Sequence, residues 1–168
     1  MRIALDIDGV LADFGLHFFD YLGIEDKTPA KFWDDPRFRN NMHLIGGDAE
    51  FWLGIPPLVT PDELEFVPIA YVTARDIETQ ITRAWLRLNG FPDVHVETVK
   101  LGGSKVKFLK GINPDFYIDD AIHNFEELND SGVNTLLMTR SHNEDYDAGD
   151  KRVKSFTDFK DRFIYAGV

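Results

Sequence analysis

Five short apolar stretches recur along this chain, and most lack the alternation of apolar and polar residues that marks a strand with one exposed face. They span residues 2–7, 68–73, 94–98, 115–118 and 133–138. Helix-like segments follow the later four. The clearest of these repeats apolar residues at helical spacing from Ile77 until Gly90, a common C-terminal stop. This order predicts an α/β fold with a five-stranded parallel sheet and right-handed crossovers.

One interval interrupts the alternation of strands and helices. About sixty residues separate the first stretch from Pro68, which is too many for a plain loop. The interval is rich in aromatic residues, because 9 of the chain's 22 lie within positions 14–52. One interpretation is a small helical subdomain that needs its own core. The other is a lid whose inner face contacts a flat substrate, and both can hold for different rings.

Composition excludes several classes of function. The formal net charge is −11, whereas binding a long nucleic acid requires a basic surface. No apolar run approaches the roughly 20 residues of a membrane span, and the first residues do not read as a signal peptide. The chain has no cysteine, which excludes disulfides and fits a reducing compartment. We therefore expect a cytoplasmic protein with a small-molecule partner and no membrane contact, while its oligomeric state is left open.

Acidic pairs follow two of the apolar stretches. Asp6 and Asp8 end the first, and in an extended chain they point to the same side. Asp119 and Asp120 follow the fourth. Open α/β sheets bind ligands at the carboxyl ends of their strands, and carboxylates gathered there repel one another unless a cation joins them. Either pair alone could be a turn or a helix cap, but together they predict one site for Mg²⁺, which prefers hard oxygen ligands.

Two further residues could bind an anion. Thr73 ends the second stretch just before a helix, where a hydroxyl and free backbone N–H groups can hold an anion, although a plain helix cap is the simpler interpretation. Lys105 follows Ser104 at a predicted helix start, where a cation opposes the helix dipole. Lys107 lies near the start of the same helix. The spacing does not decide between the two lysines, and either could be a solvated surface residue.

The ordered set Asp6-x-Asp8-Gly-Val-Leu, Thr73, Lys105 and Asp119-Asp120 resembles the four motifs of the haloacid dehalogenase (HAD) superfamily of phosphohydrolases. Within it, residues 12–14, 51–58, 142–143 and 152–156 resemble the 5′(3′)-deoxyribonucleotidases. The second motif departs from that group. Its Thr-Ala-Arg sequence, with residues 84–86 and 90–92, is similar to other small HAD phosphatases, including polynucleotide phosphatase-like members.

The resemblance implies a Rossmann-like sheet with the first strand at its centre and a small helical cap inserted after it. Residues 1–13 and 65–168 would form the catalytic core, and residues 14–64 the cap. The implied activity is an Mg²⁺-dependent phosphomonoesterase that works through an aspartyl-phosphate, most simply a 5′-nucleotidase. The alternatives are a HAD phosphatase for another small ester or a polynucleotide end, and a non-catalytic HAD-fold binding protein. A receiver-like signalling module has no place for the long insertion.

The resemblance also implies a catalytic role for four residues. Asp6 would attack phosphorus, and Lys105 would steady the attacking carboxylate. Asp8 would protonate the leaving alcohol and then take a proton from water. Thr73 would hold a phosphoryl oxygen.

The remaining implied contacts are to the metal and to the substrate. Mg²⁺ would be bound by Asp6, the backbone carbonyl of Asp8 and Asp120, with Asp119 contacting a metal-bound water or orienting Lys105. For the substrate, a nucleotide, we expect contacts from Arg75 and stacking by rings of the cap such as Phe18, Trp33 and Trp52.

Overall fold

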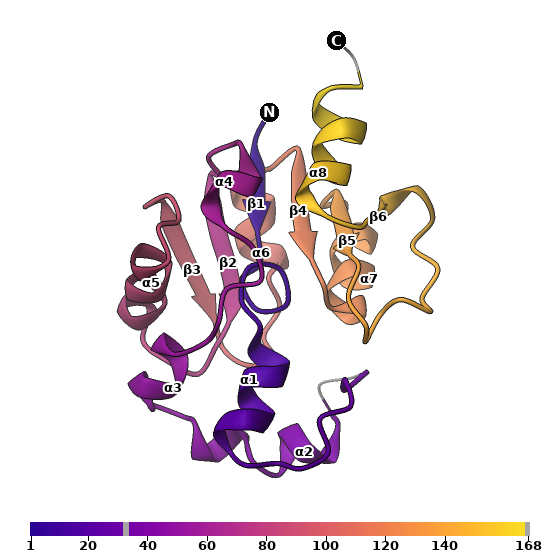
Figure 1. Cartoon of the computed structure of the whole chain (residues 1–168). Coiled ribbons are helices and arrows are strands. Elements are labelled where there is room, and N and C mark those ends of the chain that lie inside the picture. Colours follow the sequence, from indigo (N-terminus) through magenta and orange to yellow (C-terminus); the bar gives the residue numbers. More distant parts are fainter. Residues whose placement is uncertain (32–33, 167–168) are drawn as a thin grey trace.

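A six-stranded parallel sheet forms the centre of the protein, in the order β3-β2-β1-β4-β5-β6 (Figure 1). We describe it from a computed structural model that covers residues 1–31 and 34–166. The strands are β1 (Ile3–Leu5), β2 (Ala70–Ala74), β3 (His95–Val99), β4 (Phe116–Asp119), β5 (Thr135–Met138) and β6 (Arg152–Val153). The predicted α/β class and the five predicted strands are confirmed. The sixth strand, β6, has two residues and pairs with β5, and so short a strand carries no periodicity.

Helices follow the later strands in the predicted order. They are α5 (Thr79–Leu88), α6 (Val106–Ile112), α7 (Ile122–Asp130) and α8 (Phe156–Phe159), with the short helices η2 (Gly149–Lys151) and η3 (Lys160–Ile164) before and after α8. Ser155 caps α8, because its side chain accepts a hydrogen bond from the Asp158 N–H. Of these helices, α5, α6 and α7 lie in the crossovers between consecutive parallel strands, whereas α8 and η3 follow the last strand.

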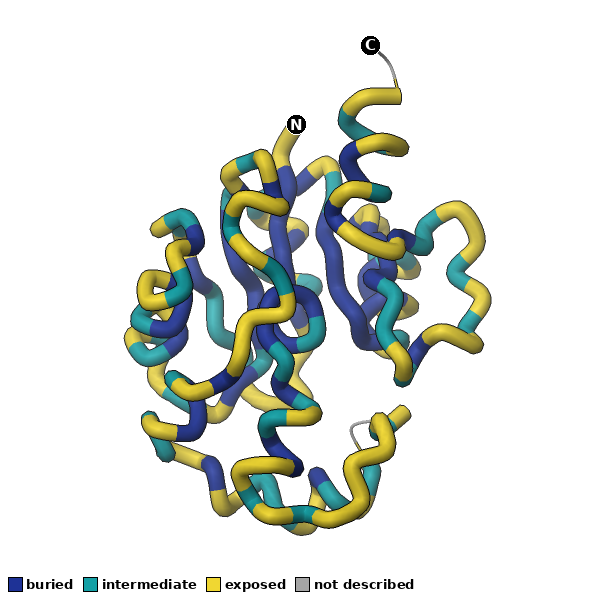
Figure 2. The backbone as a smooth tube through the Cα atoms, in the orientation of Figure 1, coloured by how far each residue is buried: buried dark blue, intermediate teal, exposed yellow. Residues whose placement is uncertain are grey.

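Each strand distributes its side chains between two layers, since successive residues point to opposite faces of a sheet. In β1, Ile3 and Leu5 join the larger apolar cluster, which includes residues of α5 and α8. Ala4 joins the smaller cluster, which contains Leu109 of α6 and Leu128 of α7. Helices therefore cover both faces of the sheet, and Figure 2 shows its central strands as buried. This explains why the strand segments are apolar without alternation.

The segment inserted between β1 and β2, which we call the inserted segment (residues 14–64), is helical. It contains α1 (Phe14–Tyr21), α2 (Pro36–Arg39), η1 (Met42–Leu44), α3 (Ala49–Leu53) and α4 (Pro61–Leu64). The strands of the sheet point toward α1, α2 and α3 (Figure 1). These helices therefore lie beyond the carboxyl edge of the sheet, which is the edge where open α/β folds bind ligands.

Aromatic residues of the inserted segment pack mainly on one another. The ring of Phe18 lies 5.1 Å from that of Phe38 and 6.2 Å from that of Phe51, between centroids. Trp52 is 1% exposed, and its Nε1 donates a hydrogen bond to the Ile45 carbonyl at 3.1 Å. These contacts correct the expectation that Phe18 and Trp52 stack on a substrate, because both rings are enclosed in the core.

A third ring expected to stack, Trp33, lies outside the described residues.

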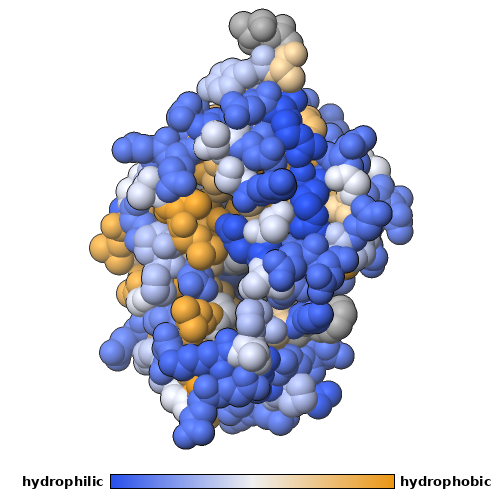
Figure 3. Space-filling model, turned by 45° about the vertical axis from the view of Figure 1, so that its right-hand side comes forward, coloured by the Kyte–Doolittle hydropathy of each residue, from blue (hydrophilic) through white to orange (hydrophobic). Residues whose placement is uncertain are grey.

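Within the described ranges, no helix is long and apolar enough to cross a membrane. Hydrophilic residues dominate the face shown in Figure 3, where apolar side chains form separate groups.

Candidate active site

Three buried carboxylates meet where β1 and β4 end. Asp6 follows β1 directly, Asp119 ends β4, and Asp120 comes next. The two strands are parallel neighbours that pair Leu5 with Ile118, so their ends are level. One oxygen from each carboxylate lies within 4.8 Å of the others. Because carboxylate oxygens are the hard ligands that Mg²⁺ prefers, this group of three could hold that ion.

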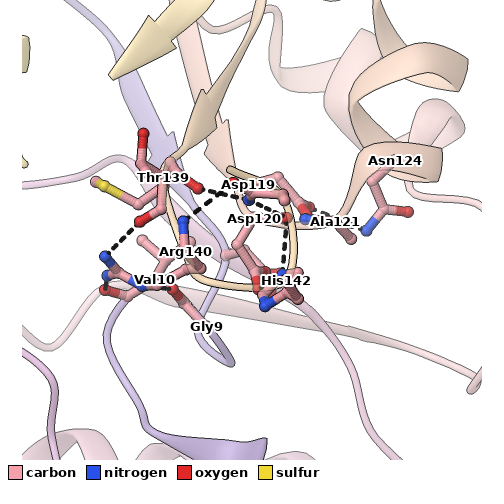
Figure 4. Close-up of polar contacts among 12 residues, drawn as sticks. Gly9, Val10, Asp119, Asp120, Ala121, Asn124, Thr139, Arg140 and His142 are labelled. Carbon is pink, nitrogen blue, oxygen red and sulfur yellow. Dashed lines mark hydrogen bonds and ion pairs between the residues drawn. The ribbon is translucent and has the colours of Figure 1, made fainter. Parts of the chain in front are cut away.

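The turn after β1 requires glycine at position 9. Gly9 has a φ of +78°, a conformation that residues with a Cβ atom rarely adopt. A Cβ atom there would lie 1.9 Å from Oδ2 of Asp120. Glycine therefore allows the backbone of this turn to approach the Asp120 carboxylate closely (Figure 4).

Lys105 is the buried cation of this site. It occupies the N-cap position of α6 and is 2% exposed. Its Nζ lies 2.9 Å from Asp119 Oδ2 and 3.1 Å from Asp6 Oδ2, and it donates a hydrogen bond to the Tyr117 hydroxyl. Lys107 lies two residues further on, in the first turn of α6, and is exposed. The structure thus brings Lys105, and not Lys107, to the carboxylates.

Burial and charge shift the ionisation of these groups in different directions. Burial raises the pKa of Asp6 well above its ordinary value; Lys105 opposes that change and the neighbouring carboxylates reinforce it. Burial also raises the pKa of Asp119, but Lys105 and hydrogen bonds to the carboxylate outweigh it, so the net shift is downward. Burial lowers the pKa of Lys105, yet the charges of Asp119 and Asp6 raise it overall. Lys105 therefore stays charged, and Asp6 is a carboxylate that a metal cation would stabilise.

Asp8 forms an ion pair with Arg75. Nε and Nη2 of Arg75 donate hydrogen bonds to the two carboxylate oxygens at 2.8 and 2.7 Å. The Arg75 side chain is fully buried, and its guanidinium lies 5.0 Å from the centroid of the Trp52 ring. As far as the structure describes the lining of the cavity near Asp8, Arg75 is not part of it. The expectation that Arg75 contacts substrate is therefore corrected, because its donors already bind Asp8.

Thr73 lies in β2, beside β1, and is buried. In the described part of the chain, its Oγ1 is a buried side-chain atom without a hydrogen-bond partner. Leaving a buried donor unsatisfied costs about 1–3 kcal/mol. A ligand oxygen at this position would recover that cost.

Arg140 is a site residue that sequence reasoning missed. Its Nε and Nη2 donate hydrogen bonds to the carbonyls of Gly9 and Val10, at 2.5 and 3.1 Å. It thereby fixes the turn that follows β1 (Figure 4). Burial lowers the pKa of Arg140, while Asp120 and Asp13 oppose this. The sequence signal that could have identified Arg140 was its position two residues after β5, which places it at the carboxyl edge of the sheet.

His142 and Asn143 follow in the same loop, and both bind Asp120. His142 Nε2 lies 2.9 Å from Asp120 Oδ2, and the Asn143 side chain donates to the Asp120 carbonyl at 2.8 Å. Burial lowers the pKa of His142, but its hydrogen bond to Asp120 raises it overall. These residues figured in the sequence resemblance without a role, and the structure shows that they hold Asp120 in place.

A cavity of about 910 Å³ lies between the inserted segment and the carboxyl edge of the sheet. The site contributes Asp8, Gly9 and Asp120 to its lining, and the loop after β5 contributes Arg140 and His142. The inserted segment contributes apolar and basic side chains, among them Phe14, Leu16, Phe38, Leu58, Lys27 and Lys31. A cavity of this size and mixed character suits a small-molecule ligand.

The sheet, the carboxylates after its two central strands and the insertion after β1 define a HAD-like α/β fold, and solved structures agree. A HAD-like family hydrolase from Streptococcus pneumoniae matches with a TM-score of 0.61 and 15% identity, over 96% of this chain and 97% of that one. A dehalogenase solved as an intermediate complex matches with a TM-score of 0.65 and 10% identity, over 95% of each. A HAD phosphatase from Thermococcus onnurineus matches with a TM-score of 0.53 and 13% identity, over 95% and 96%.

Sequence comparison adds a narrower relationship. No family model matches the chain. A protein from Oceanobacillus iheyensis described as "Putative nucleotidase" is 32% identical over 78 residues. The match spans 45% of this chain and 42% of that protein. The resemblance seen in the sequence is thus confirmed at the level of the HAD-like fold.

Proposed function

We propose that this protein is an Mg²⁺-dependent phosphomonoesterase in which Asp6 is the nucleophile. The observation that carries the proposal is the 3.1 Å contact between Lys105 Nζ and Asp6 Oδ2, beside Asp119 and Asp120. A phosphate monoester is anionic and repels a carboxylate, so positive charge must be present before attack. Lys105 supplies one fixed charge. Mg²⁺, when bound by Asp6, Asp120 and the Asp8 carbonyl, would supply most of the rest.

The reaction uses the side chains in two steps. A carboxylate oxygen of Asp6 attacks phosphorus, the bond from phosphorus to the leaving alcohol breaks, and Asp8 gives that alcohol a proton. Water then attacks the aspartyl-phosphate, Asp8 takes a proton from it, and phosphate and free Asp6 result. Arg75 donates one hydrogen bond to each oxygen of Asp8, so each oxygen keeps a second lone pair that can carry the transferred proton. Thr73 Oγ1 donates to a phosphoryl oxygen throughout.

We further propose that the substrate is a nucleoside 5′-monophosphate and that residues 14–64 act as the cap that selects it. The phosphoryl site alone would accept any monoester, so selectivity requires contacts beyond it. Support comes from the cavity, whose apolar lining suits a planar base, and from the name of the Oceanobacillus relative. The Thr-Ala-Arg sequence at Thr73 favours other small phosphate esters or a polynucleotide end as the second candidates.

The test is turnover of nucleoside monophosphates, sugar phosphates and 3′-phosphorylated DNA ends, with Mg²⁺ and with EDTA. We expect Mg²⁺-dependent release of phosphate, fastest from nucleotides. Acid quenching during turnover of a labelled substrate should leave label on the wild-type protein and none on Asp6→Asn. Asp115→Asn is the matched control, because Asp115 is an exposed aspartate that binds the Arg2 N–H before β4. No turnover of any ester by the Mg²⁺-loaded protein would refute the proposal.

A further inference from the structure

Tyr117 connects Lys105 with the strand that carries Thr73. Its side chain is fully buried in β4. The hydroxyl accepts a hydrogen bond from Lys105 Nζ at 2.9 Å and donates one to the Val72 carbonyl, also at 2.9 Å. Val72 directly precedes Thr73 in β2. One hydroxyl group therefore contacts both the buried ammonium and the strand that carries Thr73.

Small residues on the sheet allow Tyr117 to reach this far. In the strand order β2-β1-β4, β1 separates Tyr117 from Val72. The register places Ala4 of β1 opposite Tyr117 on one side and opposite Ala70 on the other, and all of them belong to the apolar cluster on the α6–α7 face. Because Ala4 has only a methyl side chain, the Tyr117 ring can cross β1. A larger residue at position 4 would block the ring.

The contact with Tyr117 matters because it is one of only three hydrogen bonds that the Lys105 ammonium can donate. An ammonium group has three N–H donors, and here they face Asp119, Asp6 and Tyr117. Asp6 would carry the phosphoryl group during turnover, so its contact with Lys105 must change. The tyrosine hydroxyl is uncharged and takes no part in bond making, so its contact can stay constant. The orientation of that hydroxyl is fixed, because its proton is donated to the Val72 carbonyl.

We propose that Tyr117 is a positioning residue. It holds the Lys105 ammonium and the β2 backbone before Thr73 at the relative positions that the phosphoryl transition state requires. The inference rests on the proposed function for the roles of Lys105 and Thr73, and adds the residue that keeps them together. Because Lys105 would act on the reacting phosphoryl group and not on the leaving group, loss of the hydrogen bond that positions Lys105 should lower kcat more than it changes KM.

Tyr117→Phe tests the proposal, because it removes one oxygen and keeps the ring that crosses β1. Tyr71→Phe is the matched control. Tyr71 is also fully buried and also donates to a backbone carbonyl, that of Pro92 at 3.2 Å, but it belongs to the apolar cluster on the other face of the sheet. We expect Tyr117→Phe to lower kcat about tenfold or more, as for a lost hydrogen bond to a charged group. KM should change less than about twofold, and kcat for nucleotides and nitrophenyl phosphate should fall by the same factor.

Tyr71→Phe should keep the wild-type kcat, even if its melting temperature falls by as much as that of Tyr117→Phe. Equal kcat losses in the two variants would overturn the proposal, because both would then reflect packing alone. A kcat within about twofold of wild type in folded Tyr117→Phe would overturn it as well.

A readout without turnover separates this inference from the proposed function. A buried, hydrogen-bonded ammonium exchanges its protons slowly, so the Lys105 side-chain signal should be visible by ¹H–¹⁵N NMR in the metal-free protein. The signal should shift or broaden in Tyr117→Phe and stay unchanged in Tyr71→Phe. If no phosphate ester is hydrolysed but the signal responds in this way, the proposed activity fails and the positioning contact stands. An unchanged signal in Tyr117→Phe would refute the contact itself.

Discussion

Arg75 binds both carboxylate oxygens of Asp8, and this buried ion pair gives different surroundings to two aspartates that are two residues apart. Asp6 faces Lys105 and the carboxylates of Asp119 and Asp120 at the end of β4. Asp8 faces a planar guanidinium from the end of β2, with two parallel hydrogen bonds that define its orientation. The proposed nucleophile, Asp6, and the proposed proton carrier, Asp8, thus differ in their cationic partners, which are a lysine for Asp6 and an arginine for Asp8.

The first prediction concerns the stability of that pair. Arg75→Met should destabilise the protein by about 3–5 kcal/mol, because it leaves the Asp8 charge buried without its partner. Combining it with Asp8→Asn should recover part of the loss, since the uncompensated charge is then gone. Urea unfolding of the single and double variants measures both values. A double variant less stable than Arg75→Met alone would contradict this account.

The second prediction concerns Asp6 in the metal-free protein. Its pKa lies above the value in the unfolded chain, so the folded state binds more protons and stability falls as pH rises through that interval. Asp6→Asn removes the cost of this buried charge. In EDTA at pH 7, the variant should therefore melt at a higher temperature than wild type while losing all turnover. The stability difference should shrink as the pH is lowered toward about 4, near the ordinary carboxyl pKa. A lower melting temperature at pH 7 would contradict the prediction.

The third prediction separates the two aspartates that follow one another at the end of β4. Asp119 is saturated by Lys105, the Ala121 N–H and Asn124, so Asp119→Asn should lower the melting temperature even in EDTA. Asp120 would bind the metal directly. Asp120→Asn should therefore abolish the rise in melting temperature that Mg²⁺ causes in wild type. Thermal melts with and without Mg²⁺ test both statements, and a full Mg²⁺ response in Asp120→Asn would exclude it as a ligand.

The fourth prediction compares two lysines of the same helix start. Lys105→Ala should lower kcat on the order of 10²-fold, by analogy with the loss of a transition-state donor. Lys107→Ala should leave kcat near the wild-type value, because Lys107 is exposed. Steady-state kinetics on nitrophenyl phosphate decide the ranking, and the reverse order would transfer the catalytic role to Lys107.

The fifth prediction concerns the rings and side chains of the inserted segment. Trp52→Ala should cost about 3–5 kcal/mol of folding free energy, as expected for a buried tryptophan. Leu16 lines the cavity and is 47% exposed. Leu16→Ala should raise KM for nucleotides roughly tenfold, equivalent to about 1.4 kcal/mol of lost apolar contact, with little change in stability. Unfolding curves and KM values for both variants test this contrast; a stable Trp52→Ala protein with a selectively raised nucleotide KM would reverse it.

The order of strands, helices and acidic pairs along the chain was predictable, because each of these features depends on residues close together in the sequence. Apolar runs without alternation indicate strands covered on both faces, and parallel strands bring their carboxyl ends to one edge. The sequence therefore places Asp6 and Asp119 at the same edge of the sheet. The observed register of β1 and β4 places them together for this reason.

Partners across the sheet depend on strand order and on side-chain packing, which no local pattern contains. Arg75 was expected at the substrate, yet its guanidinium packs against Trp52 and pairs with Asp8. Trp52 was expected to stack on the substrate, but the ring lies in the core. A spacing rule assigns a residue to a strand or helix, whereas its contacts depend on which elements become neighbours.

The sequence by itself determined the α/β class, the edge of the sheet that carries the candidate site and the types of side chain gathered there. Only the tertiary structure decided that Lys105 and not Lys107 reaches the carboxylates, and that Tyr117 spans β1 to reach Val72. The physical reason is distance along the chain. Tyr117 and Val72 are 45 positions apart, and their contact exists because β2, β1 and β4 lie side by side with alanine at position 4.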